Sequence, residues 1–338
     1  MKLSQQYDAL RVQAAELARR GAWSDLAVLL SARTDDAAVA VPELVTLHAE
    51  SYMHTGRPRE ARDFLTTQIP ELARRRERGS LRSCTNMLGV AHFTLGELDD
   101  ARQTFERALE LGDQDDDALT VARATNNLGA IANVRGAREE ALTHYQLAIP
   151  AYQHLGNAVG LAQSYHNMAI TFRDLAQLDR ADDCERRAIE FARQGGSESL
   201  TLLAQLGRAE VSLRAGDAML AEVRARETAR GFAALGDATN QADALRLVGA
   251  ALTAQGRYDA ARQALDAALA HAREHDNVLH EAETLRARAD LSARSGERQR
   301  AHADAMDALA IFERLGAVPE IESLRQWLDA FEMGGAPA

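Results

Sequence analysis

The sequence predicts an all-α solenoid of about eight helical hairpins followed by a C-terminal capping helix. Three observations support this fold class: a composition rich in helix formers, glycines that recur every 40 residues, and an alanine at a fixed distance after each break. Hydrophobic residues make up 46% of the 338 residues, whereas aromatic residues make up 5% and only six prolines occur. Because strands favour aromatic and β-branched residues, this composition favours helices.

The breaks between helices form a column with a 40-residue step. The column comprises Gly56, Gly96, Gly136, Gly216, Gly256 and Gly296, with alanine at position 176. Glycine tolerates the left-handed conformation that commonly ends a helix, so each break is expected to be a turn. Alanine follows five residues later in every unit, at Ala61, Ala101, Ala141, Ala181, Ala221, Ala261 and Ala301.

Two further columns share this spacing. Small residues stand seven positions before each break, at Ala49, Gly89, Gly129, Ala169, Ala209, Gly249 and Ala289, as expected if two helices cross closely. An apolar column lies eight residues after the alanines, at Ile69, Leu109, Ile149, Ile189, Ala229, Leu269 and Leu309. Each hairpin is too small to bury its own apolar face, so stacked neighbours are expected to supply the core.

The ends of the chain depart from the repeat, as solenoid ends do. Residues 1–38 are predicted to form an atypical N-terminal hairpin around Gly21 and Trp23, and residues 39–316 seven 40-residue repeats. Residues 317–333, which contain Pro319, are predicted to form the capping helix, and residues 334–338 a loose tail. All of these parts are expected to belong to one solenoid spanning 1–338.

The segment GELDDARQTFERAL, with Gly96, Ala101, Phe105 and Ala108 at the family's positions, resembles a tetratricopeptide repeat. The resemblance extends over about residues 40–316, although the common family unit has 34 residues. Long units of this kind are similar to those of Pins-type polarity adaptors, kinesin light chains and the sensor domains of some bacterial regulators. The resemblance implies a right-handed superhelix whose first helices line a concave groove that binds a protein or peptide.

Counting from the small-residue column places a set of polar residues in that groove. The candidate binding residues are Asn86, Phe93, Arg123, Asn126, Asn133, Gln163, His166, Arg173, Arg246 and Arg286. Asparagine amides both donate and accept hydrogen bonds, which suits an extended peptide backbone, and the resemblance implies such a role here. The alternative is that these residues are merely solvated. Arg246 and Arg286 would suit a carboxylate or phosphate, but the neighbouring Asp243, Glu283 and Asp290 are expected to pair with them.

Signals of catalysis or metal binding are weak. His271 and His275 share a helix face, but the sequence indicates no third ligand for zinc. The acidic run 113–117 lacks the pattern of a calcium loop and is expected to cap the next helix. Cys84 and Cys184 are expected to be buried apolar residues. No phosphate-binding, nucleophile-elbow or dinucleotide motif occurs, so the sequence predicts no cofactor, no metal and no enzymatic activity.

The charge balance bears on the class of partner. The net charge is −11, which argues against a nucleic-acid ligand because phosphate contacts need a basic face. No run of 18 apolar residues and no signal-peptide core occur, so a cytoplasmic location without membrane attachment is expected. The predicted function is a scaffold that binds a protein or peptide; the alternative is a regulatory sensor that changes shape on binding a signal peptide or small effector. The oligomeric state stays open.

Overall fold

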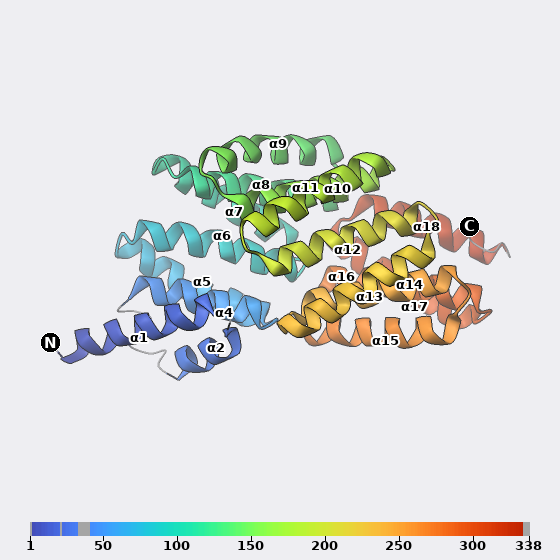
Figure 1. The fold of residues 1–338 in the computed structure, drawn as a ribbon, viewed down its shortest axis with the longest axis horizontal. Helices are drawn as coiled ribbons and strands as arrows, with labels where there is room; N and C mark the ends of the chain where they lie inside the picture. The colour runs from blue at the N-terminus through green and yellow to red at the C-terminus, as the bar shows by residue number, and fades with distance from the viewer. Residues whose placement is uncertain (1, 21, 33–40, 334–338) are drawn as a thin grey trace. The chain divides into compact units, whose positions relative to one another are not determined.

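The computed structural model describes residues 2–20, 22–32 and 41–333 of the chain. Within these ranges the chain forms seventeen α-helices and no strand (Figure 1), so the predicted all-helical fold is confirmed. The predicted turn residue Gly21, the expected junction between the N-terminal hairpin and the first repeat near residues 38–39, and the predicted loose tail 334–338 lie outside the described residues.

The helices form eight hairpins and a final single helix. The hairpins are α1 (Lys2–Arg19) with α2 (Trp23–Ser31), α4 (Pro42–His54) with α5 (Pro58–Arg74), α6 (Arg78–Thr94) with α7 (Leu98–Gln114), α8 (Ala118–Val134) with α9 (Arg138–His154), α10 (Ala158–Asp174) with α11 (Leu178–Gln194), α12 (Glu198–Arg214) with α13 (Ala218–Leu235), α14 (Ala238–Ala254) with α15 (Tyr258–Glu274), and α16 (Val278–Arg294) with α17 (Arg298–Leu315). Helix α18 (Val318–Glu332) is the predicted capping helix.

The turns within the hairpins repeat one hydrogen-bonded geometry. At Gly136 (φ 84°) the amide donates to the Asn133 carbonyl over 2.9 Å, and the next amide donates to the carbonyl of Ala132. These two bonds cap the carbonyls that a helix end leaves open. Ala176, which replaces the glycine, keeps the left-handed conformation (φ 57°) and the same two bonds. The turn geometry therefore does not require glycine.

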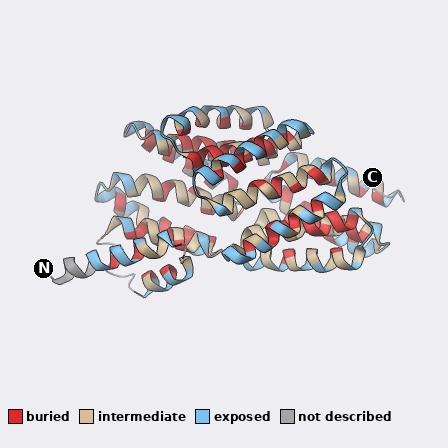
Figure 2. Cartoon of the chain, viewed as in Figure 1, coloured by how far each residue is buried: buried red, intermediate tan, exposed pale blue. Residues whose placement is uncertain are grey.

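Close helix crossings explain the two small-residue columns. The seven alanines of the column from Ala61 to Ala301 are fully buried, each 0% exposed. At the crossings, a Cβ atom added to Gly89 would lie 2.5 Å from the Phe105 ring, and one added to Gly129 would lie 2.6 Å from the Tyr145 ring. Larger residues at these positions would push the two helices of a hairpin apart, as the sequence predicted. Figure 2 shows the buried residues gathered on the helix faces that meet.

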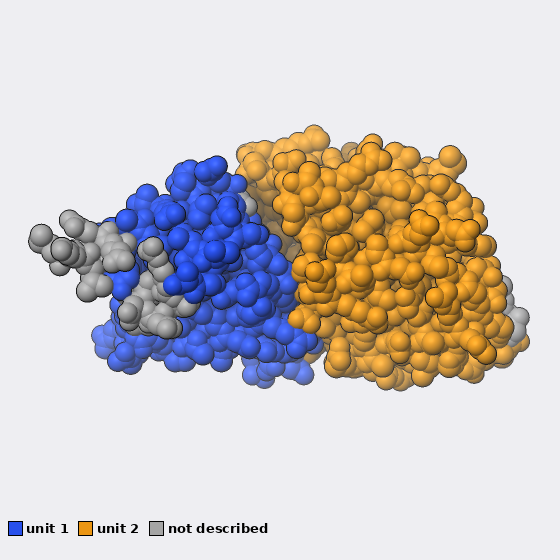
Figure 3. Space-filling model, turned by 90° about the horizontal axis from the view of Figure 1, so that it is seen from below, with its two compact units in different colours: residues 1–124 blue, residues 125–338 orange. Residues whose placement is uncertain are grey.

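The chain divides into two compact units, residues 1–124 and residues 125–338 (Figure 3), with the boundary inside α8. Unit 1 has a core that includes Val45, Leu65 and Leu72, and unit 2 has a core that includes Phe232 and Leu265. The organisation as one solenoid over 1–338 stays a prediction.

A search of the described residues finds no helix with the length and apolar character needed to cross a membrane.

Candidate functional site

The first helices of successive hairpins in unit 2 lie side by side: α10 contacts α12, α12 contacts α14, and α14 contacts α16. Because the hairpins are 40 residues apart, side chains from the same repeat columns meet on this layer. Arg173 of α10 lies 3.3 Å from Glu210 of α12, and Arg246 of α14 lies 3.4 Å from the same carboxylate. Arg246 also contacts Asp243 at 2.7 Å and Glu283 of α16 at 3.6 Å. A chain of alternating charges thus crosses four helices.

Helix α18 adds its first two turns to this layer. The Arg286 guanidinium of α16 donates a 2.8 Å hydrogen bond to the Ser323 hydroxyl of α18. Pro319 lies against Gly136 at the α8–α9 turn, where an added Cβ would stand 2.6 Å from the proline ring. Between these contacts, Glu320 is half-buried close to the charges of α10 and α16. We call Arg173, Glu210, Asp243, Arg246, Glu283 and Glu320 the charge cluster.

Burial and ion pairing act in opposite directions on the carboxyls of the charge cluster. Burial alone would raise the pKa of Glu210, but Arg173 and Arg246 outweigh it and hold the pKa below its ordinary value. At Asp243 the Coulomb interactions with Arg246 and His280 outweigh burial and lower the pKa to about 2. Burial prevails at Glu283, whose pKa is raised although Arg246 opposes the change.

Two buried polar atoms of the charge cluster have no hydrogen-bond partner among the described residues. They are Nε of Arg173, a donor, and Oε2 of Glu320, an acceptor. Burial raises the pKa of Glu320, and the nearby Asp174 adds to the rise. A buried polar atom without a partner is unfavourable by about 1–3 kcal/mol. The cluster therefore contains one unmet donor and one unmet acceptor.

The asparagines predicted to bind peptide in unit 2 connect α8 to α10. Asn126 is 1% exposed, and its amide oxygen accepts a 3.0 Å hydrogen bond from the Ser164 hydroxyl. Asn133 is half-buried; it accepts from Thr171 over 2.8 Å and donates to Asp174 over 3.3 Å. The structure therefore places Asn126 inside the helix layer, whereas Asn133 reaches the edge of the charge cluster.

The other predicted residues fall into separate places. His166 is buried against Glu185, with its Nδ1 3.0 Å from the carboxylate, and Gln163 is exposed on α10. In unit 1, Asn86 and Phe93 are half-buried on α6 and Arg123 is exposed on α8. Unit 1 therefore shows no counterpart of the charge cluster at these three residues.

Sequence reasoning missed two members of the charge cluster, Glu210 and Glu320, and the neighbouring Asp174. Glu210 stood in a groove column, and its sequence signal was an acidic residue between the columns of Arg173 and Arg246. Asp174 is adjacent to Arg173 and lies 3.7 Å from both Arg138 and Arg214. Glu320 carried no signal, because repeat spacing says nothing about where the first turn of a capping helix docks.

Three groups of described residues have side chains close enough to share a metal ion: His271 with Glu274 and His275, His92 with Glu97 and Asp100, and Asp243 with His280 and Glu283. The sequence indicated no third ligand beside His271 and His275, but the structure brings the Glu274 carboxylate within 4.8 Å of both. Glu274 is exposed. In the third group both carboxylates already contact Arg246, so a cation would compete with an arginine.

Two expectations from the sequence are confirmed outside the charge cluster. Cys84 and Cys184 are buried, and burial raises the pKa of each thiol to about 11, which makes them poor nucleophiles. Asp117 caps α8, because its carboxylate accepts from the amides of Leu119 and Thr120 over 3.1 and 3.2 Å. The last residue of the acidic run is thus a helix cap, as predicted.

Comparisons with known proteins agree with this architecture. Two family models described as tetratricopeptide repeats match residues 81–112 and 120–194. Among solved structures, the chain is similar to a Rap conjugation gene regulator of the plasmid pLS20 in complex with the Phr* peptide, with a TM-score of 0.64, 14% identity, and 98% of this chain and 88% of that chain covered.

Two other solved structures share the fold. A Rap protein complexed with Competence and Sporulation Factor has a TM-score of 0.61 and 13% identity, and 98% of each chain is covered. A signal transduction ATPase with a tetratricopeptide repeat sensor from Pyrococcus horikoshii has a TM-score of 0.51 and 13% identity, with 89% of this chain and 41% of that chain covered. The repeat columns, the hairpin geometry and the matched family models lead to one conclusion: residues 81–112 and 120–194 are tetratricopeptide repeats, and the described chain shares the fold of tetratricopeptide repeat proteins.

Proposed function

We propose that the chain is a non-catalytic binding protein and that its unit 2 binds an extended peptide segment on the first-helix layer, at the charge cluster. The observation that carries this proposal is the pair of unmet hydrogen-bonding atoms, the donor Nε of Arg173 and the acceptor Oε2 of Glu320. A peptide unit offers a carbonyl to the first and an amide to the second. Small rotations of these half-buried side chains would expose both atoms to a ligand.

The remaining charges would orient the ligand. Asp243 and Glu210 are held ionised by their arginines, whereas Glu283 and Glu320 have raised pKa values. A cationic group of the ligand beside Glu283 and Glu320 would stabilise their charged forms. Of the residues predicted from the sequence, Arg173 and Arg246 belong to this site, and Arg286 and Asn133 border it. We further propose a cytoplasmic location, with protein or peptide partners and neither nucleic acid nor membrane as ligand.

A regulatory sensor is the second candidate, and the position of α18 favours it. The first two turns of α18 contact Gly136 and Arg286, which are 150 residues apart in sequence. A ligand that displaced Glu320 would therefore act on both ends of unit 2 at once. Two solved relatives of similar fold are complexes with the Phr* peptide and with Competence and Sporulation Factor, which supports a small peptide as the signal.

The proposal is tested by selecting binders for the full chain from a displayed library of random peptides and measuring their affinity by fluorescence polarisation. Arg173→Gln and Glu320→Gln are each expected to weaken binding by about tenfold, the equivalent of about 1.4 kcal/mol. Arg186→Gln on the exposed face of α11 is the matched control and should bind as the wild type does. Asn126→Ala is a poor probe, because Asn126 is buried.

The pH dependence gives an independent measure. Because the folded pKa values of Glu283 and Glu320 are raised, both carboxyls gain a proton first as the pH falls, and a cationic peptide would then lose its attraction. Affinity is expected to decline with acidification in the wild type, and to be both lower and flatter in Glu320→Gln. Selected peptides that bind all variants equally, at every pH, would refute the site.

A further inference from the structure

The outward face of α13 differs from those of the other second helices. It carries Met219, Leu220 and Val223, which are 73%, 38% and 54% exposed. Forty residues earlier, α11 has only charged residues at the same three repeat positions, namely Asp179, Arg180 and Asp183. Helices α5, α7 and α9 carry only charged or polar residues there, and α15 and α17 each carry a single alanine, Ala260 and Ala303. Among these second helices, large apolar residues at the three positions are therefore specific to α13. Exposed apolar patches on a polar surface mark sites of association.

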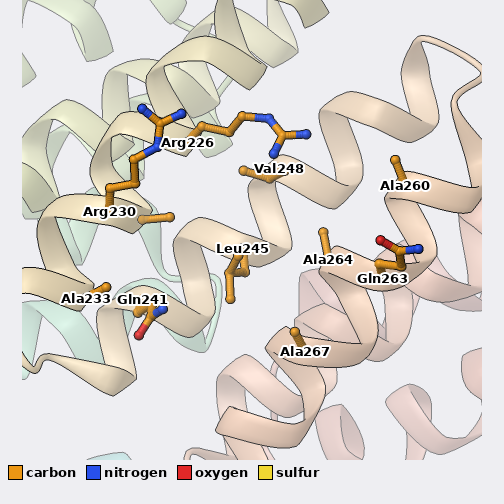
Figure 4. A pocket seen from close by; sticks show the side chains of 11 residues that line it. Arg226, Arg230, Ala233, Gln241, Leu245, Val248, Ala260, Gln263, Ala264 and Ala267 are labelled. Carbon is orange, nitrogen blue, oxygen red and sulfur yellow. The ribbon is translucent and has the colours of Figure 1, made fainter.

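A cavity of about 410 Å³ opens beside this face, between α13, α14 and α15 (Figure 4). It is lined by small residues, including Ala229, Ala260, Ala264 and Ala267, with Leu245 and Val248 of α14 among its walls. The cavity has a cause in the sequence, because Ala229 stands in the apolar column where the neighbouring repeats have Ile189 and Leu269. The missing side-chain carbons leave a recess that the fold itself does not fill.

The protruding side chains and the recess lie along one stripe of α13. Met219, Val223, Arg226 and Arg230 follow one another at spacings of four, three and four residues, which places them on the same helix face. Arg226 and Arg230 also line the cavity. Arg230 and the nearby Glu227 are exposed, and neither has a charged partner among the described residues. One half of the stripe is thus convex and apolar, and the other half is recessed and basic.

We propose that this face pairs with the same face of a second copy of the chain, with the two α13 helices antiparallel about a twofold axis near Arg226 and Glu227. In that arrangement Met219 and Val223 of one copy lie over the recess beside Arg230 of the other. Glu227 of each copy lies beside Arg226 and Arg230 of its partner. Arg226 already pairs with Glu222 of its own helix at 2.9 Å, so the unpaired charge that Glu227 complements is that of Arg230. A twofold axis requires a patch that matches itself, and α13 carries both halves of the match.

The test is sedimentation equilibrium of the full chain over a concentration series. The wild type is expected to dimerise. Met219→Asp combined with Val223→Asp introduces the residues that α11 carries at these positions, and should weaken dimerisation by at least about tenfold, or about 1.4 kcal/mol. Ala229→Ile fills the recess with the residue of its own column and should weaken it as well. Leu147→Arg is the matched control: Leu147 is 65% exposed on α9, and Arg187 occupies that position in α11.

A cross-link fixes the geometry. Glu227→Cys places a thiol close to the proposed axis, so two copies should form a disulfide with each other under mild oxidation, whereas the native Cys84 and Cys184 are buried. Circular dichroism of each variant shows that the fold persists. The proposal would be overturned by a wild type that stays monomeric to about 100 μM, or by a double aspartate variant that dimerises as well as the wild type. It would also be overturned if Leu147→Arg weakened dimerisation as much as the aspartates do, or if Glu227→Cys did not cross-link. The charge cluster takes no part in this surface, so the result is independent of peptide binding.

Discussion

Glu50 in unit 1 and Glu210 in unit 2 occupy the same repeat position, one residue after the small-residue column. Burial favours the neutral form of both carboxyls, but the net change in pKa has opposite signs. The pKa of Glu50 is raised by burial, which outweighs the opposing charge of Arg123. The pKa of Glu210 is lowered, because Arg173 and Arg246 overcome the same burial. One position in the repeat therefore holds an unfavourable buried acid in one unit and a firmly ionised one in the other.

The contrast extends to the neighbouring groups. Unit 1 surrounds its buried His48 with aromatic rings, at centroid distances of 4.6 Å to Tyr52 and 4.7 Å to Phe64. Unit 2 uses ion pairs that run from helix to helix. The repeat fixes backbone and register but leaves the inner layer free to be aromatic or charged. The two units are consequently expected to respond differently to substitution and to acid.

The chain supplies a reporter for each unit: its two tryptophans are Trp23 in unit 1 and Trp327 in unit 2. Trp23 stacks on His54 at 4.0 Å, and Trp327 stacks on Phe331 at 5.0 Å. Replacing either tryptophan by phenylalanine leaves the fluorescence of the other, so urea unfolding of each unit is followed separately.

The largest expected effect is that of Arg246→Ala on unit 2. The substitution leaves Asp243, Glu210 and Glu283 facing one another without their shared cation. Removing one partner of a buried ion pair typically destabilises by about 3–5 kcal/mol. The midpoint of the Trp327 transition should fall sharply, while the Trp23 transition stays in place. Arg74→Ala, at an exposed i,i+3 pair in unit 1, is the control and should leave both midpoints unchanged.

Acidification should affect unit 1 next most strongly. Burial, with Arg57 adding to it, lowers the pKa of His48 from 6.5 to about 4. The neutral imidazole is therefore favoured in the folded state. The stability that the neutral imidazole gives unit 1 is fully present above pH 6.5. It is lost as the pH falls toward 4, with a maximum loss of about 3 kcal/mol in the free energy of unfolding. The Trp23 midpoint measured between about pH 7 and 4 should show this decline. His48→Met should largely abolish it; an unchanged pH profile in that variant would assign the effect to other groups.

The smallest effect sharpens the comparison of the two glutamates. Because the folded pKa of Glu50 is raised, its charged form disfavours folding near neutral pH, and Glu50→Gln should stabilise unit 1 by less than about 1 kcal/mol. Glu210→Gln should instead destabilise unit 2, because two arginines lose their carboxylate. The two urea midpoints are expected to shift in opposite directions, upward for Glu50→Gln and downward for Glu210→Gln. Shifts in the same direction would show that the effect of the glutamate on stability follows from its repeat position and not from its ion pairs.

Much of this fold is predictable from its sequence because one structural rule is repeated. The glycine and alanine columns determined where helices end and cross, and even Ala176 keeps the expected turn. Exposure was less predictable: Asn86 and Asn126 share a column, yet the first is half-buried and the second is buried against Ser164. A column fixes the direction of a side chain, whereas its exposure depends on the neighbouring helix.

The candidate site was predictable only in part. The arginines Arg173 and Arg246 stood in groove columns, and Asp243 and Glu283 were expected partners of Arg246. Glu320 was not foreseeable, because its place depends on how far unit 2 curves before α18 begins. Ala229 was visible in the sequence as the one small residue in an apolar column, but only the structure shows that the position opens a cavity.

Solenoids usually tolerate gain or loss of whole units, because each unit contacts only its neighbours. The packing of Pro319 on Gly136 departs from that rule, since it connects the start of the last helix to a turn 183 residues earlier. A duplicated or deleted 40-residue block between these two residues would move them out of reach of each other. The number of hairpins between Gly136 and Pro319 is therefore fixed. In related sequences, insertions in unit 2 should occur in loops and not as additional 40-residue repeats.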